Sequence, residues 1–472
     1  MIRSWAFACF AVLAALVSPA RTAAQSGKPC AIVITGVIRG ADTTRFRSVI
    51  TATGGRNTYV GGVVDATCEG QGNRLLADSA EHFADQGLLI LYHNVRYSEP
   101  RVRITSDKMF YYTNDERLIA EGNVRGVSAS GTRFSGPQIE YYRDKPGVRT
   151  LPYWIATGRP SMRMSPSESG ADPGTSTDSL DLVANRIYSL NDSLVWASGQ
   201  VVIERSDMRA TADSATLDNG IEFARLMRTP RIVGKGERAF TLVGVEIDMW
   251  SKERKLERVL SSGDAQATTD SLLLTSDTID LRLVDQQMNR VYTWGGRSRA
   301  VSAQQDIESD SMDIHMPQQQ LERVHAIGRA IAFSTVDTAR VMSSERDWIA
   351  GDTLDAQFET TDLPRDRAGS DSVAPGSATQ MREVTASGAA QAFYQLPPAG
   401  GARGAPNLSY NRGRMIKVLF DDGEMATVTV NEKASGLYLE PIAGAAPATA
   451  PATAPATASA APIPPPTRER KP

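Results

Sequence analysis

Residue types that most often carry chemistry are scarce in this sequence. The 472-residue chain has four histidines and three cysteines. The histidines are His82, His93, His315 and His325. No two of them, and no histidine with a cysteine, are spaced as ligands of one zinc motif. No nucleophile elbow, phosphate-binding loop or dinucleotide-binding fingerprint occurs in a suitable context. The sequence therefore predicts a protein that is not an enzyme and that uses no metal or cofactor.

A spaced series of aspartates is the one acidic array in the chain. Its slots fall at positions 78, 107, 137, 185, 213, 245, 277, 310 and 352, so most neighbouring slots lie roughly 30 residues apart. Pro137, Asn185 and Val245 replace Asp in three slots. Calcium binding would need several oxygen ligands converging from each turn, whereas most units offer one Asp beside a Ser. We therefore interpret the aspartates as turn residues that bond nearby backbone N–H groups.

A second signature, apolar-x-small-x-Gly, follows the slots. Clear instances end at Gly122, Gly199, Gly263, Gly328 and Gly388, which follow the slots at 107, 185, 245, 310 and 352. Glycine weakens a strand unless the backbone bends or another chain segment approaches closely. The recurrence of this glycine in register predicts such a bend in every repeat.

Both signatures alternate apolar and polar residues with a period of two, the period of a β-strand. Polar clusters between them, such as 191–193, suit hairpin turns. We therefore expect an all-β protein, an elongated open β-jellyroll or solenoid of roughly 30-residue, two-strand repeats. Strands about 4.8 Å apart would make a rod near 100 Å long. The residues expected to face inward are Met109, Tyr111, Ile187, Val201, Ile203, Ile247, Met249, Ile279, Leu281, Met312 and Ile314.

The two ends of the chain differ in composition from its body. Residues 1–24 combine Arg3, an apolar run and small-residue cleavage sites, as in a cleaved secretory signal peptide. We then expect a start segment at 25–74, repeats at 75–395 with loops near 160–179 and 361–380, a C-terminal β segment with a loop at 396–442, and a disordered Ala/Pro/Thr-rich tail at 443–472. Cleavage leaves Cys30 and Cys68, which either form a disulfide or stay as separate buried thiols.

Overall composition excludes two further classes of protein. The chain has 51 basic and 54 acidic residues, a net charge of −3, so we expect no general attraction to nucleic acid. Hydrophobic residues make up 41% of the chain, too many for a disordered body. No segment after the signal is apolar for long enough to cross a bilayer as a helix.

Two stretches carry a family resemblance. Residues 104–107 precede Leu-Ile-Ala-Glu-Gly-Asn-Val at 118–124, and Trp-Ala-Ser-Gly-Gln-Val-Val-Ile at 196–203 precedes Arg-Ala-Thr-Ala-Asp-Ser-Ala at 209–215. A small-x-Gly-x-Val strand thus comes before a strand with an Ala-Asp-x-Ala element. Repeated over roughly residues 75 to 395, these units resemble the OstA-like family of lipopolysaccharide-transport proteins. That family includes the periplasmic bridge proteins and the N-terminal jellyroll domain of the outer-membrane assembly partner.

The resemblance implies a fold and a function. It implies an open jellyroll whose apolar trough, lined by the inward residues, shields the lipid A acyl chains of lipopolysaccharide in the periplasm. It implies end strands that join other jellyroll proteins of the transport system end to end by strand addition, with self-association as a further expectation. It places the chain in the periplasm, with the outer membrane as an associated site. Shielding acyl chains needs buried apolar area, worth about 25 cal/mol per Å², and no catalytic group.

Two other functions remain open at this point. A non-transport structural or surface β-solenoid would use the same apolar stripe as a closed, dry core. A repeat-based carbohydrate enzyme would need carboxylates clustered on one face, and the aspartate slots are too evenly dispersed for that. The chain also departs from a simple bridge protein in its length, its inserted loops and its Pro-rich tail.

Overall fold

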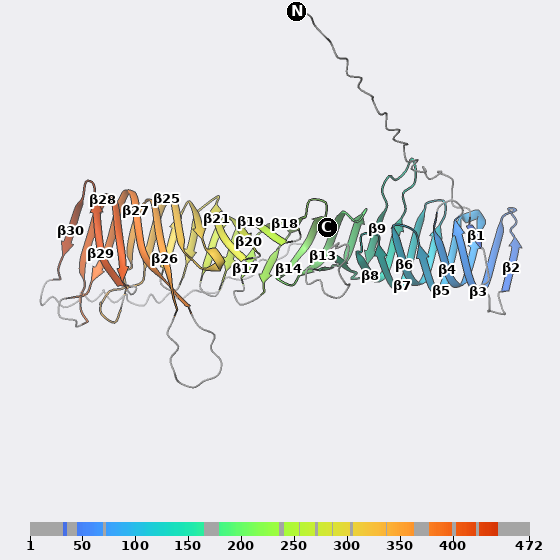
Figure 1. The fold of residues 1–472 in the computed structure, drawn as a ribbon, viewed down its shortest axis with the longest axis horizontal. Coiled ribbons are helices and arrows are strands. Elements are labelled where there is room, and N and C mark those ends of the chain that lie inside the picture. The colour runs from blue at the N-terminus through green and yellow to red at the C-terminus, as the bar shows by residue number, and fades with distance from the viewer. Residues whose placement is uncertain are drawn as a thin grey trace, which may run out of the picture.

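The computed structural model is an elongated stack of β-strands running crosswise to its long axis, from β2 at one end to β30 at the other (Figure 1). It describes residues 32–34, 45–68, 72–164, 179–235, 240–253, 255–269, 272–285, 287–302, 305–336, 338–362, 377–398, 403–421 and 424–441. This part of the chain has no α-helix, only two short 3-10 turns, Ala84–Gln86 and Pro317–Gln319. Its thirty strands form one continuous sheet. The predicted elongated all-β fold is confirmed.

The sheet is folded lengthwise into two layers. Fourteen of the thirty described strands cross from one layer to the other without a break, and the other sixteen each lie in one layer. The uninterrupted strands are β3 (Arg56–Cys68), β4 (Arg74–Phe83), β5 (Leu88–Ser98), β6 (Val102–Tyr112), β7 (Arg117–Ser128), β8 (Arg133–Tyr142), β13 (Leu194–Glu204), β14 (Met208–Asp218), β19 (Lys255–Thr268), β20 (Leu273–Val284), β25 (Arg323–Ser334), β26 (Asp347–Asp362), β27 (Ser377–Leu396) and β28 (Asn407–Asp421).

The interrupted strands define the layers. The first layer holds β2 (Arg45–Ile50), β9 (Tyr153–Thr157), β12 (Arg186–Leu190), β15 (Phe223–Met227), β18 (Glu246–Lys252), β21 (Gln287–Trp294), β24 (Ser311–His315) and β29 (Glu424–Asn431). The second layer holds β1 (Ile32–Ile34), β10 (Ser161–Met164), β11 (Leu180–Val183), β16 (Arg231–Gly234), β17 (Thr241–Val243), β22 (Ser298–Val301), β23 (Gln305–Ser309) and β30 (Ser435–Leu439). All pairings between these strands are antiparallel, as the hairpin prediction requires.

Many crossings are corners built from the two repeat signatures, whereas at slots 78 and 213 the left-handed pairs His93–Asn94 and Arg228–Thr229 contain no glycine. Between β6 and β7 the register shifts between Thr105 and Lys108, so that the single residue Asp107 lies opposite the pair Gly122–Asn123. Both members of that pair have positive φ, 75° and 46°. A Cβ on Gly122 would lie 2.6 Å from Oδ2 of Asp107. Glycine is therefore required both for the left-handed backbone and for the close approach of the aspartate.

The same corner recurs along the rod. Slot residue and glycine meet in the pairs Asn185–Gly199, Val245–Gly263, Asp277–Gly295, Asp310–Gly328 and Asp352–Gly388. The predicted bend at the recurrent glycine is confirmed, and the two signatures of the repeat are thus one structural element, brought together from neighbouring strands.

The predicted hydrogen bonding of the aspartates is wrong. Asn94 donates to Asp78 at 2.7 Å and Asn123 donates to Asp107 at 2.7 Å. Arg329 donates to Asp310 at 2.6 Å. In the described contacts these aspartates accept from side chains across the corner and not from backbone N–H groups. The reason is that the slot residue points outward, where the second residue of the left-handed pair also places its side chain.

Aromatic side chains fill the space between the layers. The rings of Phe134, in the second-layer half of β8, and Trp154 of β9 stack with centroids 4.7 Å apart. Tyr97 and Tyr141 approach to 6.4 Å in the same way. All four are at most 3% exposed. The core therefore lies between two facing layers and not on one side of an open sheet.

The repeat extends beyond its expected limits of 75 and 395. β3 already carries a corner register shift, between Gly61 and Val64. Residues 407–413, expected within a loop, belong to β28, which pairs with β27 from Leu396 to Glu383. The backbone groups of β27 need this partner, and that need overrides the local Pro and Gly content. The signal peptide at 1–24, residues 165–178 and 363–376, and the tail at 443–472 lie outside the described residues.

Candidate functional site

The apolar interior between the two layers is the candidate site. All eleven residues that the sequence predicts to face inward lie there, with exposed fractions of 0 to 4%. They belong to one hydrophobic cluster that runs from Val60 in β3 to Val418 in β28. Strand alternation explains this, because each layer turns its apolar residues towards the other. The interior is thus continuous along the stack, and its lining is chemically inert.

One side of the molecule lies opposite the corners, and the hairpin turns of both layers lie along it. We call this side the mouth of the interior. A cavity of about 550 Å³ lies there near the C-terminal end, lined among others by Ile349, Met381, Val384, Val418 and Phe420. Smaller cavities of about 120 and 210 Å³ lie further along the mouth. Turn residues of both layers, such as 128–129 and 191–192, line the cavity of about 210 Å³. The mouth is therefore where the layers leave space.

A buried polar cluster closes the mouth in the N-terminal third. Arg143, next to the first layer, contacts Glu99 in a second-layer turn at 2.8 Å and Glu116 in a first-layer turn at 2.6 Å. The side chain of Arg143 is 8% exposed, and those of Glu99 and Glu116 are 6% and 9% exposed. The hydroxyls of Tyr97 and Tyr111 each donate to one of these carboxylates at 2.9 Å. The cluster ties the two layers together where the mouth would otherwise be open.

Burial sets the protonation of this cluster. It raises the pKa of Tyr97, Tyr111 and Tyr141, and the neighbouring glutamates raise it further. Burial alone would lower the pKa of Arg143, but Tyr97 and Glu99 raise it overall. The tyrosines therefore stay as neutral donors and the arginine stays charged at neutral pH.

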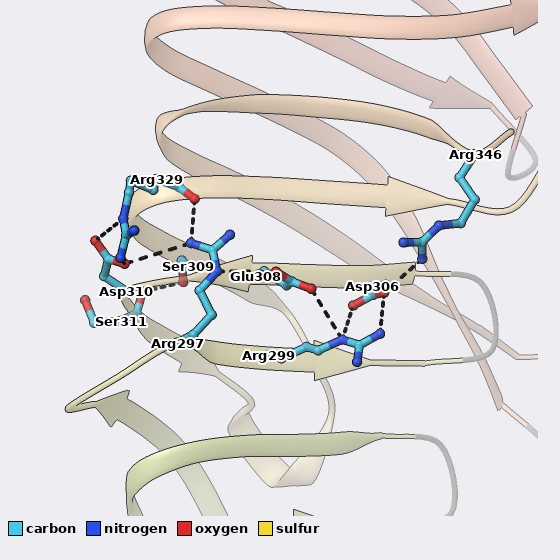
Figure 2. A network of polar contacts seen from close by, with 9 residues as sticks. All are labelled: Arg297, Arg299, Asp306, Glu308, Ser309, Asp310, Ser311, Arg329 and Arg346. Carbon is cyan, nitrogen blue, oxygen red and sulfur yellow. Dashed lines mark hydrogen bonds and ion pairs between the residues drawn. The ribbon is translucent and has the colours of Figure 1, made fainter.

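Figure 2 shows a polar network on β22, β23 and the neighbouring segments. Through Arg346 it reaches the cavity of about 550 Å³. Arg299 of β22 and Arg346 contact the same buried carboxylate, Asp306 of β23, at 2.8 and 2.9 Å. The hydrogen bond from Arg299 is the main cause of the lowered pKa of Asp306. The guanidinium of Arg346 also lies 4.2 Å from the ring centroid of Phe333, which lines the cavity. The rim of the cavity is therefore held by charge pairs.

Asp280 lies between the inward residues Ile279 and Leu281, so strand alternation places it on the outer face, yet it is buried. Asp280 is 2% exposed, because Arg258 covers it from β19 at 2.9 Å and Arg282 from its own strand at 2.8 Å. The predicted alternation along the strand still holds, because Asp280 points away from the interior. A neighbouring arginine, absent from the local pattern, removes it from water.

Both ends of the stack present strands with a free edge. Among the described residues, β2 pairs with β3 alone and β30 with β28 alone. Phe46 and Ile50 of β2 are 65% and 71% exposed, and Leu437 and Tyr438 of β30 are 56% and 51% exposed. Unpaired apolar edge strands are sites where another strand can be added.

The remaining predicted site residues are accounted for as follows. Cys68 is disulfide-bonded, while Cys30 lies outside the described residues. His325 contacts Asp355 and His315 contacts Glu322. Within the described part of the chain no group of three potential metal ligands occurs, and no helix there is long and apolar enough to cross a membrane.

Sequence reasoning missed the polar residues at the mouth. Glu99 and Arg143 are 44 residues apart, and Glu116 and Arg143 are 27 apart. Gln395, which lines the cavity of about 550 Å³, was missed as well. These residues follow the end of a strand or lie near it, where the alternation of two stops, so no local pattern marks them.

Comparison with known proteins identifies no family. No protein-family model matches the chain, and no curated protein matches it. The resemblance to OstA-like proteins therefore remains a prediction from the repeat units themselves.

Proposed function

We propose that this chain is a periplasmic lipopolysaccharide-transport and outer-membrane assembly protein that shields acyl chains between its two β-layers. The observation that carries the proposal is the continuous apolar interior, which runs through β3 to β28 and has a mouth along one side. The identity of the lipid comes from the resemblance of the repeat units.

The energetics suit a carrier of this kind. Acyl chains gain about 25 cal/mol for each Å² of apolar surface removed from water, and side chains such as Ile279 and Met312 supply apolar walls over the whole length. Contacts of this kind are not directional, so a chain can slide along the interior without breaking hydrogen bonds. Strand addition at β2 and β30 would extend the interior into neighbouring proteins of the transport system.

Site-specific photo-crosslinking in cells tests the proposal. A photoreactive amino acid at Ile279 or at Met312 should capture lipopolysaccharide, because both side chains face the interior. Asp280 is a poor control because it is buried under two arginines. Glu257, exposed on the outer side of β19, is the matched control and should capture none. Equal capture at the inner and outer positions would refute the proposal.

A structural β-solenoid with a closed, dry core is the second candidate. The tight packing of the eleven inward residues, all at most 4% exposed, favours it. In that case the inner crosslinkers would capture only other residues of this chain. Lipid would then be absent both from the crosslinked products and from the purified protein.

A further inference from the structure

The cavity of about 550 Å³ near the C-terminal end combines apolar and polar lining residues. Its volume of about 550 Å³ lies in the usual range for a small-molecule site. First-layer residues such as Met381, Val418 and Met425 line it opposite second-layer residues such as Ile349. Asp347 and Gln395 line it as well. The cavity thus has the two kinds of wall that an amphiphile requires.

Gln395 is held in one orientation. It is 5% exposed, and its Nε2 donates to the carbonyl of Glu345 at 2.9 Å and to Oδ1 of Asp347 at 3.2 Å. Its backbone N–H donates to the same Oδ1 at 3.0 Å. Both partners of Nε2 can only accept, so the amide cannot be turned round without losing both bonds.

This orientation leaves a buried acceptor unused. Within the described part of the chain, Oε1 of Gln395 is buried and has no hydrogen-bond partner. Such atoms are rare in folded proteins, because an unpaired buried polar atom costs stability. A ligand that brings a hydrogen-bond donor to this atom would recover that cost. A ligand without one would not.

One wall residue of the cavity is fixed by a contact between two segments that are distant in the sequence. Val341, 3% exposed, lines the cavity and forms a bridge with Gly404, while the N–H of Met342 donates to the carbonyl of Gly404 at 2.8 Å. The segment around 341 is therefore pinned to the segment around 404.

We propose that this cavity is a discrete binding site for one class of amphiphile, an apolar chain with a neutral head that donates a hydrogen bond, such as a hydroxyl, to Oε1 of Gln395. This inference rests on the proposed function and deepens it, since it makes one position in the interior selective. At Gln395 a carboxylate head would meet the acidic Asp347 and an acceptor oxygen, whereas Arg340 supplies the one basic side chain of the described lining.

A pair of probes tests the site without altering the protein. A terminally brominated long-chain alcohol and its methyl ether have the same apolar chain, but only the alcohol can donate. Trp348 lines the cavity, and bromine should quench its fluorescence in the full chain. Trp348→Phe should remove that part of the quenching. We expect the alcohol to bind roughly three to ten times more tightly than the ether, the ratio that one net hydrogen bond provides.

Two variants assign the effect to the acceptor. Gln395→Met should bring the affinity for the alcohol down to that for the ether. Gln391→Met is the matched control, because Gln391 lies on the same strand but bonds Tyr410 at 2.8 Å and is outside the cavity lining. It should keep the preference for the alcohol. If the unaltered chain binds both probes equally, or if Trp348 is not quenched, the inference is wrong.

The crosslinking and quenching experiments together distinguish the selective cavity from the general carrier function. Capture of lipopolysaccharide at Ile279 and Met312 without quenching of Trp348 would refute the selective cavity and leave the carrier function standing. Failure of both experiments would refute the carrier function itself.

Discussion

Arg143→Met should strongly destabilise the N-terminal third of the molecule. The substitution keeps a long side chain but removes the cation that contacts both Glu99 and Glu116. Both carboxylates are buried, so water cannot replace the arginine. Two buried negative charges would then face each other across the mouth.

The size of the effect follows from this geometry. Removing one partner of a buried ion pair usually costs about 3–5 kcal/mol, because the other charge stays buried. Here one arginine serves two carboxylates, which places the expected loss at the upper end of that range. Adding Glu99→Gln to the variant removes one orphaned charge and should restore part of the loss.

Hydrogen exchange is the suitable assay, because stability in a stacked repeat protein is local. Amides of β5 to β8 should lose protection in Arg143→Met, whereas those of β25 to β28 should not. Arg163→Met is the control. Its pair with Asp181 is 56% and 36% exposed, and surface pairs contribute at most about 1 kcal/mol. The reasoning fails if Arg143→Met costs no more than Arg163→Met.

Three further predictions concern the corners, the core and pH, all read by unfolding in urea. Gly328→Ala should lower the free energy of unfolding by about 1–3 kcal/mol, since the new Cβ would lie 2.5 Å from the carboxylate of Asp310. Gly131→Ala, at a glycine with positive φ but open space, should lower it by about 1 kcal/mol. Equal losses would contradict the steric argument. Phe134→Ala should lower the free energy of unfolding by about 3–5 kcal/mol, because Phe134 is buried against Trp154. Phe46 is 65% exposed, so Phe46→Ala should lower it by less than about 0.5 kcal/mol. Similar values would place Phe134 outside the core. Burial raises the pKa of Asp347, so stability falls as pH rises from the ordinary aspartate pKa of about 4 through that raised pKa. Asp347→Asn should flatten this fall, and an unchanged slope would count against the reasoning.

Much of the fold could be predicted because its information is local. A period of two fixes which residues face inward, and every one of the eleven is buried. The glycine signature predicts the bend, because few other residues tolerate a left-handed backbone. The sequence also places the slot residues at regular intervals, although it does not show that most of them meet a glycine from a neighbouring strand.

The remainder depends on contacts between distant residues. Asp280 is buried by Arg258, which is 22 residues away on a neighbouring strand. Arg143 meets Glu99 across the mouth only because two turns of different layers face each other. The strand at 407–413 forms because β27 requires a partner, against the local composition. Pairing between strands decides each of these features, and no single stretch of sequence contains it.

Lipid binding by the purified chain is the most direct test of the central claim. Native mass spectrometry should show a complex with lipopolysaccharide whose acyl chains are intact and none with the deacylated form, since the apolar interior contacts only the chains. Equal binding of both forms, or no complex with either by a chain that keeps its β-structure, would contradict the account.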